Sequence, residues 1–441
     1  MSRLFGTDGI RGVAGTELTA ELATRVSAAM TRVLCKNTPR VLIGMDTRES
    51  SGWISAAVAQ GVKQMGGEAV TVGVCSTPAM AYLVKSGRYD GGIMISASHN
   101  PYIYNGIKLF GSEGVKLSDD DEDRIEELIV EPIGGGGSII SGEWELERYI
   151  DYLCSCFDFR AEGMRIGIDC ANGSATVVAE RVFKATGAEC HIISDRPDGR
   201  NINDGCGSTC IGRLQALVRD EGLDLGIAFD GDADRCIAVD EYGCEVDGDQ
   251  IIAILALWLK EQGRLRGSAV VGTVMSNMGL GRFCADNGIG FFPAPVGDRY
   301  VLELMRQNGY SLGGEQSGHI IMSDLASTGD GILTALALLC RIKESGKSLS
   351  TLAAVMKKYP QYTVNIPADS IDKANLVNDK PISEMIYSAK SSLGDNGRLL
   401  IRPSGTEPLI RIMAEGEEQS YIIGLCHSLA GAIGGRLREI R

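Results

Sequence analysis

The chain has 441 residues, of which 44% are hydrophobic and 23% charged, as in ordinary soluble globular proteins. At about 100–200 residues per domain, this length predicts three or four domains. The formal net charge of −14 argues against nucleic acid as a main partner, because phosphate backbones are bound mainly through lysine and arginine. A small anionic ligand stays compatible with this charge, since a few basic groups in one cleft suffice to bind it.

The cysteines and histidines indicate neither a zinc cluster nor a disulfide framework. The 13 cysteines are scattered without a CxxC pair, and four histidines are few for a zinc cluster. The odd cysteine count, the length and the lack of a signal-peptide pattern predict reduced thiols in a cytoplasmic protein. The longest apolar run, residues 251–259, is too short to span a membrane. We therefore expect no membrane partner.

Three segments repeat one pattern: a buried-type strand, a polar turn, an amphipathic helix and a second strand. In chain order they cover residues 41–74, 164–194 and 268–298. Such β-α-β units form mostly parallel sheets that are covered on both faces. A spacing of roughly a hundred residues is too long for a solenoid, so the pattern indicates three similar α/β domains. Four glycines at 134–137 read as a loop inside the first domain, because a helix toward Cys154 follows them.

The C-terminal segment is organised differently. A helix is expected over 380–394, strands over 397–404 and 408–416, and a final helix over 418–440. A hairpin with helices predicts a smaller α+β domain.

The segment DGDADR lies between two apolar strands and carries three alternate carboxylates, Asp230, Asp232 and Asp234. Such carboxylates can converge on one hard cation, and Mg2+ would keep positions open for phosphate oxygens. Glu241 falls at position 12 of a calcium EF-hand counted from Asp230. However, position 6 is Arg235 where that loop needs glycine, and the flanks are strands, so we reject the calcium loop. A solvated acidic turn stays open as the alternative.

The segment ASHNP follows another buried-type strand and contains Ser98. Serine is a poor nucleophile unless a base removes its proton or a phosphate already sits on it. His99 and Lys108 are near enough in sequence to supply charge or proton transfer. A polar turn built on Asn100 before Pro101 fits the same residues equally well.

The segment GEQSGH combines a carboxylate, a hydroxyl and an imidazole between glycines. Glu315 and Ser317 stand two apart, so on an extended loop both side chains point the same way, as suits adjacent sugar hydroxyls. A structural turn is the alternative, and it is the more common role for a lone histidine such as His319. The nearby GDR, residues 297–299, adds a charged turn of weak specificity.

The segment RPSGTEP between two expected strands is suited to holding a phosphate. Arg402 supplies a bidentate fork, Ser404 and Thr406 supply hydroxyls, and Gly405 lets backbone N–H groups turn inward. Arg411 would reinforce this loop, and an ordinary hairpin turn is the alternative. The segment FGTDGIRG adds Arg11 as a second candidate phosphate ligand.

A metal, a hydroxyl nucleophile, a polyol-binding loop and a phosphate anchor are the parts of a phosphoryl-transfer site for a sugar phosphate. The strings FGTDGIRG, IGMDTR, SASHNP, GEQSGH and RPSGTEP, in this order, resemble the α-D-phosphohexomutase superfamily over the whole chain. They are most similar to its bacterial members that act on glucosamine phosphates. The resemblance implies an α/β protein of four domains in a heart-shaped arrangement, three similar α/β domains with mixed sheets plus a C-terminal α+β domain. We expect the serine loop in 1–153, the metal loop in 154–250, the sugar-specificity loop in 251–366 and the phosphate-binding domain in 367–441.

The resemblance implies an isomerase-class intramolecular phosphotransferase that interconverts glucosamine 6-phosphate and glucosamine 1-phosphate. It further implies a phosphoserine enzyme, a glucosamine 1,6-bisphosphate intermediate and a place in UDP-N-acetylglucosamine and peptidoglycan-precursor synthesis. The same reaction on glucose or mannose phosphates is the first alternative, and a non-catalytic phosphosugar sensor is an alternative of another class. The partner is a small phosphosugar, and a homodimer is compatible with the resemblance.

The resemblance also assigns roles to individual residues. Ser98 matches the phosphorylated serine, and with Asp230, Asp232 and Asp234 it forms the set that holds one Mg2+ per chain. Arg235 matches a residue near the phosphoserine. Arg11, Lys108 and His319 match positions of proton transfer or transition-state charge. The implied substrate contacts are Gly297, Asp298, Arg299, Glu315, Ser317, Arg402, Ser404, Gly405, Thr406 and Arg411.

Two positions depart from the family pattern. Tyr104 stands where members usually have a small polar or acidic residue, which puts the loop beside Ser98 in question. Cys210 and Ile211 stand where members usually have histidine and proline, which bears on packing in the second domain.

Overall fold

The computed structural model describes residues 4–6, 8–34, 38–129, 134–404 and 408–440. The chain divides into two compact units. The first comprises Met1–Met275 with Gly288–Val355, and the second comprises Ser276–Asn287 with Met356–Arg441. Within the described residues the first unit contains three mixed sheets and the second contains one antiparallel sheet. The expected α/β class with four domains is thereby confirmed.

The first sheet has six strands in the order β1-β5-β4-β2-β3-β6. Strands β2, β3, β4 and β6 run parallel, and β5 joins β4 antiparallel. Strand β4 is buried at every position, which is why its apolar run GGIMI forms an interior strand. The glycines at 134–137 precede β6, which pairs with β3, so they lie in a loop of this domain. The bounds are β1 Ile10–Val13, α1 Ala20–Leu34, β2 Arg40–Met45, α2 Ser51–Gln64, β3 Glu68–Val74, α3 Thr77–Gly87, β4 Gly91–Ile95, β5 Tyr104–Gly111, α4 Asp119–Glu127, β6 Ser138–Ser141 and α5 Glu145–Ser155.

The second sheet has five strands in the order β11-β10-β9-β7-β8. Its core of β8, β7 and β9 is parallel, and β10 joins β9 antiparallel. Both β9 and β10 are buried throughout, as predicted for the apolar sequences LGIAF and CIAV. The bounds are β7 Arg165–Asp169, η1 Ser174–Val177, α6 Ala179–Ala185, β8 Glu189–Ile193, α7 Gly212–Glu221, β9 Leu225–Phe229, β10 Cys236–Asp240 and β11 Glu245–Val246.

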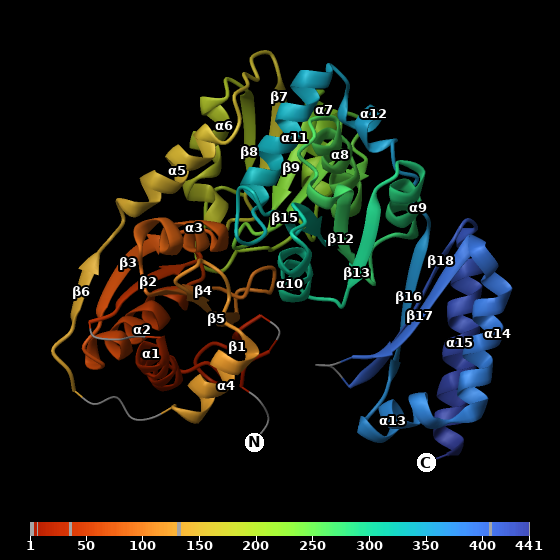
Figure 1. The fold of residues 1–441 in the computed structure, drawn as a ribbon, viewed down its shortest axis with the longest axis horizontal. Coiled ribbons are helices and arrows are strands. Elements are labelled where there is room, and N and C mark those ends of the chain that lie inside the picture. Colours follow the sequence, from red (N-terminus) through yellow and green to blue (C-terminus); the bar gives the residue numbers. More distant parts are fainter. Residues whose placement is uncertain (1–3, 7, 35–37, 130–133, 405–407, 441) are drawn as a thin grey trace. The chain divides into compact units, whose positions relative to one another are not determined.

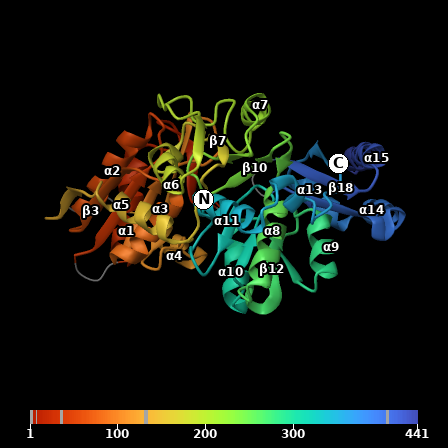
Figure 2. The same ribbon diagram turned by 90° about the horizontal axis from the view of Figure 1, so that it is seen from above.

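The third sheet has four strands in the order β13-β12-β14-β15, with β12 parallel to both neighbours and β15 antiparallel to β14. Helices α8 and α10 lie beside β12 in both views (Figures 1 and 2). Helix α8 begins at Gly248 because Asp247 caps it, accepting from the Gln250 N–H while the Gln250 side chain returns to the cap. The bounds are α8 Gly248–Glu261, η2 Arg266–Ser268, β12 Ala269–Thr273, α9 Met278–Asp286, β13 Gly290–Ala294, α10 Asp298–Asn308, β14 Leu312–Gly314, β15 Ile320–Met322, α11 Gly331–Ser345 and α12 Leu349–Ala353.

The three sheets share one feature that positions the site. In each, a parallel strand is followed directly by an antiparallel neighbour: β4 by β5, β9 by β10, and β14 by β15. The connecting loops contain Ser98, the aspartates 230–234 and the segment 315–319, respectively. Three similar domains therefore present their polar loops at equivalent points of their sheets.

The second unit is built on the antiparallel sheet β16-β18-β17. Helices α14 and α15 both pack against this sheet (Figures 1 and 2), and a core that includes Ile382, Ile410, Ile412, Ile422 and Ile433 lies between the layers. Strand β16 belongs to this sheet, although it begins before the expected domain start at residue 367. The bounds are β16 Gln361–Pro367, α13 Ser370–Asn378, α14 Lys380–Leu393, η3 Gly394–Asn396, β17 Gly397–Pro403, β18 Leu409–Gly416 and α15 Gln419–Glu439.

Two further sequence expectations concern thiols and membranes. The cysteines that the structure describes are all free thiols, as predicted. Among the described helices, none combines the length and apolar character needed to cross a membrane.

Candidate active site

Ser98 lies in the loop that follows β4, and its side chain is buried. Its hydroxyl donates to Asp230 Oδ2 at 2.5 Å and lies 3.3 Å from His99 Nδ1. Burial, together with Arg235 and Arg11, lowers the pKa of His99 to about 4, so this ring is neutral at physiological pH. The structure thus brings the predicted nucleophile and the predicted metal loop into direct contact.

The three aspartates of DGDADR converge as predicted. One carboxylate oxygen from each of Asp230, Asp232 and Asp234 lies within 4.8 Å of the others, and all three side chains are buried. Among the described residues, Asp232 Oδ1 and Asp234 Oδ1 are buried without a hydrogen-bond partner. Burial and the charges of Asp234 and Asp232 raise the pKa of Asp230 well above its usual range. A divalent cation would relieve both the unpartnered oxygens and the repulsion, so these residues fit Mg2+.

Lys108, on β5, lies against this carboxylate cluster. Its Nζ is 2.8 Å from Asp232 Oδ2 and 3.1 Å from Asp8 Oδ2, and the side chain is fully buried. Burial alone would lower the pKa of Lys108, but Asp232 and Asp8 outweigh it and raise the pKa above its usual value. Lys108 is therefore a fixed positive charge, and of the two predicted roles the geometry favours charge over proton transfer.

Two site residues were missed from the sequence, Asp8 and Lys116. Asp8 pairs with Lys108, Lys116 and Arg11, and these cations hold its pKa well below the usual range despite burial. Lys116 also lies 2.5 Å from Asp298 Oδ2. Asp8 stands inside FGTDGIRG, where only Arg11 was singled out, whereas no motif marks Lys116.

The loop after β14 brings Glu315, Ser317 and His319 together with Gly297 and Asp298. The Gly297 N–H donates to Glu315 Oε1 at 3.1 Å, and the Ser317 hydroxyl donates to Glu315 Oε2 at 3.4 Å. The Ser317–Glu315 hydrogen bond brings the two side chains together, but the segment is a turn, with the Gly318 N–H donating to the Glu315 carbonyl at 3.0 Å, and not the extended loop that the spacing argument assumed.

His319 is the histidine of this loop and lies near two carboxylates. Its Nδ1 lies 3.5 Å from Asp234 Oδ2 and its Nε2 lies 3.7 Å from Asp298 Oδ2. Burial lowers the pKa of His319, but Asp234 outweighs it and the net direction is upward. The Gly329 N–H donates to Nε2 at 3.1 Å, which favours the tautomer with its proton on Nδ1, facing Asp234.

Two predicted arginines lie beside the cluster. The Arg235 Nε is 3.9 Å from Asp230 Oδ2 and 3.8 Å from Asp234 Oδ1, and it has no hydrogen-bond partner among the described residues. Arg11 forms a salt bridge with Asp8. Both side chains are partly exposed.

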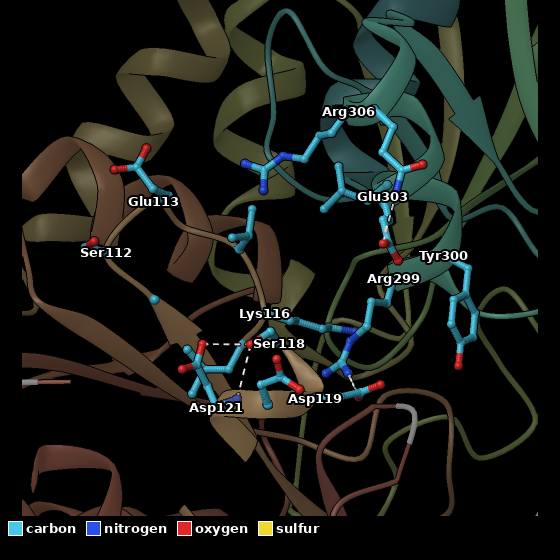
Figure 3. A pocket seen from close by; sticks show the side chains of 16 residues that line it. Ser112, Glu113, Lys116, Ser118, Asp119, Asp121, Arg299, Tyr300, Glu303 and Arg306 are labelled. Atoms are coloured by element: carbon cyan, nitrogen blue, oxygen red, sulfur yellow. Dashed lines mark hydrogen bonds and ion pairs between the residues drawn. The ribbon is translucent and has the colours of Figure 1, made fainter. Parts of the chain in front are cut away.

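Arg299 does not join the sugar loop. It follows Asp298 in the first turn of α10 and forms salt bridges with Asp119 and Glu122 of α4, the latter at 2.8 Å. Figure 3 shows the Arg299 guanidinium directed at Asp119 in the wall of a cavity of about 700 Å3. Most residues of 111–121 and several of 299–307 line the cavity, whereas Asp230, Asp232 and Asp234 do not.

The predicted phosphate loop lies in the second unit. Arg402 of β17 and Arg411 of β18 are directly opposite each other across the strand pair, and burial and Arg411 lower the pKa of Arg402. The Ser404 carbonyl accepts from Lys373 Nζ at 2.6 Å. Gly405 and Thr406 lie outside the described residues. Two cations facing each other on one side of a sheet favour an anion between them.

The two departures from the family pattern have different surroundings. The Tyr104 side chain is half-buried, and its carbonyl accepts from Arg48 Nη1 at 3.0 Å. Cys210 is exposed, while Ile211 packs against a small core that includes Leu214. Among the described residues, none of these three has a hydrogen bond or ion pair with the carboxylate cluster.

Family models match almost the whole chain. They are described as phosphoglucomutase/phosphomannomutase: alpha/beta/alpha domain I at residues 2–132, domain II at 147–243, domain III at 247–359 and the C-terminal domain at 340–432. The chain therefore belongs to the phosphoglucomutase/phosphomannomutase family, within the α-D-phosphohexomutase superfamily, as its motifs predicted.

Curated relatives are similar over their full length. A phosphoglucosamine mutase of Acetivibrio thermocellus is 48% identical, covering 99% of this chain and 100% of the relative. A phosphoglucosamine mutase of Caldicellulosiruptor saccharolyticus is 49% identical with the same coverage. Both relatives carry the name of one particular enzyme of the family, phosphoglucosamine mutase.

Solved structures are similar in fold. A phosphoglucomutase/phosphomannomutase family protein from Burkholderia thailandensis has a TM-score of 0.84 at 23% identity, covering 99% of this chain and 98% of that protein. N-acetylphosphoglucosamine mutase of Aspergillus fumigatus, in complex with GlcNAc-6P and magnesium, has a TM-score of 0.63 at 16% identity, covering 98% and 95%.

Proposed function

We propose that the chain is a phosphoglucosamine mutase that interconverts glucosamine 6-phosphate and glucosamine 1-phosphate, in the synthesis of UDP-N-acetylglucosamine and peptidoglycan precursors. The observation that carries this proposal is the 2.5 Å contact between the Ser98 hydroxyl and Asp230, inside a buried three-carboxylate cluster. Full-length relatives at nearly half identity are named for this activity. The reaction uses small soluble phosphosugars, so we place the enzyme in the cytoplasm, with neither membrane nor nucleic acid as partner and with a homodimer as one assembly to test.

Phosphorylated Ser98 donates its phosphoryl group to the free hydroxyl of the bound monophosphate. The bond from phosphorus to Ser98 Oγ breaks, a bond to the sugar oxygen forms, and glucosamine 1,6-bisphosphate results. After the intermediate turns end to end, Ser98 takes back the other phosphoryl group. The sugar hydroxyl loses its proton in the first transfer, and the leaving sugar oxygen regains one in the second, so protons balance over the cycle.

The carboxylates of Asp230, Asp232 and Asp234, with an oxygen of the Ser98 phosphate, would hold one Mg2+. When bound, the ion supplies charge neutralisation on the transferring phosphoryl group. Arg235 and Arg11 add positive charge from partly exposed side chains, and Lys108 adds a further positive charge from the buried side. His319, held on Asp234, is placed for proton transfer.

A second phosphate needs its own anion site. The facing Arg402 and Arg411, with Ser404, Gly405 and Thr406, provide the donors for it in the proposed function. Glu315 and Ser317, with Gly297 and Asp298, provide the polar groups that bind the sugar hydroxyls. Arg299 stays in the proposal as a substrate contact, although its salt bridges to α4 favour a structural role.

The choice of hexose rests on the relatives. The Gln316 side chain of the same loop donates to Asp247 Oδ2 at 3.2 Å and so helps attach the loop to the start of α8. Glucose or mannose phosphate therefore stays the alternative substrate.

A substrate panel tests the proposal. Purified protein with Mg2+ is incubated separately with glucosamine 6-phosphate, glucose 6-phosphate and mannose 6-phosphate, each with catalytic bisphosphate, and 1-phosphate formation and free phosphate are measured. The largest kcat/KM on glucosamine 6-phosphate, without free phosphate accumulating, supports the proposal. A larger kcat/KM on another hexose phosphate would show a different mutase. Steady release of free phosphate would show a phosphatase, and binding without any turnover would show a sensor.

A further inference from the structure

Arg48 is a buried residue that none of the proposed steps uses. It lies in the segment IGMDTR after β2, and its side chain has no exposed surface. All five guanidinium N–H groups have acceptors. Nε donates to Asp46 Oδ2 at 2.8 Å, Nη1 to the carbonyls of Pro101 at 2.5 Å and Tyr104 at 3.0 Å, and Nη2 to the carbonyls of Ser98 and Asn100, both at 2.8 Å.

Four carbonyls of the serine loop therefore face one planar donor group. The guanidinium presents its N–H groups in a fixed fork, so the carbonyl positions are set relative to one another. A lysine at this position would supply three donors from a single nitrogen and leave buried carbonyls unsatisfied. The Arg48 guanidinium therefore holds the loop between β4 and β5 in its conformation.

The backbone N–H of Ser98 is also connected to Arg48, through Ser96 and Asp46. The Ser98 N–H donates to Ser96 Oγ at 2.9 Å, and Ser96 Oγ donates to Asp46 Oδ2 at 2.7 Å. Asp46 also accepts from the Arg48 backbone N–H at 3.1 Å. From the second domain, Asn203 Nδ2 donates to the Ser98 carbonyl at 2.9 Å. Both polar backbone groups of Ser98 are therefore anchored to the buried Asp46–Arg48 pair.

This anchoring matters because Ser98 has a φ of 50°, in the left-handed region that residues other than glycine rarely adopt. Such a conformation persists only where the surroundings over-determine it. From it, the hydroxyl points at Asp230.

We infer that the Asp46–Arg48 pair is the positioning device of the nucleophile: it holds Ser98 in the left-handed conformation and thereby sets the rate of phosphoryl transfer without contacting substrate. The inference rests on the proposed function for its kinetic consequence, while its structural part stands on the contacts alone. Arg48 is a positioning residue, since its partners are Asp46 and backbone carbonyls.

The test compares Arg48→Lys with a matched control, Arg165→Lys. Arg165 also lies beside a carboxylate, that of Glu189, and donates to two backbone carbonyls, those of Glu221 and Gly222, but it does so in the second domain, away from the serine loop. Two readouts are taken on each full-length protein with Mg2+: hydrogen exchange of peptides covering 96–104, and kcat and KM on glucosamine 6-phosphate.

We expect Arg48→Lys to speed exchange within 96–104 and to lower kcat on the order of 100-fold, because a small misplacement of a reacting group costs about that much. KM should stay within about threefold, since the arginine does not bind the sugar phosphate. The control should match the wild type in both readouts. Wild-type exchange in 96–104, or wild-type kcat, in Arg48→Lys would overturn the inference.

A second variant keeps the test decisive if Arg48→Lys does not fold. Ser96→Ala removes the acceptor of the Ser98 N–H and retains every Arg48 contact, so it should fold, exchange faster at Ser98 and lose roughly tenfold in kcat. Unchanged exchange and kcat in Ser96→Ala would contradict the inference. Failure of the proposed function is distinguishable, because it would appear as a wild-type protein without turnover on glucosamine 6-phosphate, and the exchange comparison would still decide whether Arg48 holds the loop.

Discussion

The Ser98 hydroxyl donates to Asp230 Oδ2 at 2.5 Å, although 132 positions separate the two residues. This contact joins the first domain to the second and places a hydroxyl at the edge of three converging carboxylates. A hydroxyl alone, or an acidic turn alone, fits many roles. Their contact in a buried site, together with Lys108 and Arg235, supports the proposal that charges on several sides hold a phosphoryl group here.

The first prediction concerns the metal. Asp230→Asn keeps an acceptor for Ser98 but removes one of three mutually repelling carboxylates. We expect its thermal midpoint in EDTA to be no lower than that of the wild type, whereas the rise in midpoint on adding Mg2+ should disappear. Calorimetry with and without Mg2+ measures both, and Asp220→Asn, an exposed change in the same domain, is the control. A variant that keeps the wild-type rise with Mg2+ would place the ion elsewhere.

The second prediction concerns the arginine pair of the second unit. Arg402→Ala should raise KM for glucosamine 6-phosphate by roughly 10–100-fold, because a charge-assisted hydrogen bond contributes about 1.5–3 kcal/mol. The extent of Ser98 phosphorylation should not change. Arg438→Ala removes the same charge from an exposed position of α15 and should leave KM unchanged. Equal KM values in the two variants would show that the pair is not the anion site.

The third prediction concerns Arg299, for which sequence and structure favour different roles. Glu122, one of its partners, is almost fully buried, so Arg299→Met should destabilise the first unit by about 1–3 kcal/mol. The double variant Arg299→Met with Glu122→Gln should recover part of this loss, because the buried charge is removed as well. Urea denaturation measures the cycle. If Arg299→Met instead raises KM tenfold without loss of stability, the arginine binds substrate.

The fourth prediction concerns Asp330, the N-cap residue of α11, whose Oδ1 accepts from the Leu333 N–H at 2.9 Å and whose Oδ2 accepts from the Tyr149 hydroxyl at 2.7 Å. Burial raises the pKa of Asp330 to about 6. The native state therefore binds this proton more tightly than the unfolded chain does, so its contribution to stability falls as pH rises from about 4 to about 6 and is constant above that.

Asp330→Asn should remove that pH dependence, since asparagine caps helices as well as aspartate does. The variant should be close to the wild type near pH 4 and more stable by about 2–3 kcal/mol above pH 7. Urea midpoints at several pH values measure the difference. A difference that does not grow with pH would mean that Asp330 is not held in its protonated form.

Much of the fold and part of the site followed from local sequence. Strands such as β4 and β9 are continuous apolar runs, so their place in the sheets was predictable. Ser98 and the aspartates could be named as candidates, but their burial and mutual contact, which decide against plain polar turns, depend on packing between the domains. Lys116 was not, because its partner Asp298 is 182 positions away and no motif links them. Arg299 was assigned with Asp298, but adjacent residues of a helix project about 100° apart, so they face different neighbours. Arg48 escaped notice because its acceptors are mostly backbone carbonyls.

The most direct test of the account is intact-protein and peptide mass spectrometry of the wild type and of Ser98→Ala, each incubated with glucosamine 1,6-bisphosphate and Mg2+ and then assayed for turnover. We predict one phosphoryl group on the wild type, located at Ser98, and neither phosphorylation nor turnover in Ser98→Ala. Turnover in Ser98→Ala near the wild-type rate, or a phosphoryl group located at another residue, would contradict the central claim that Ser98 carries the phosphate.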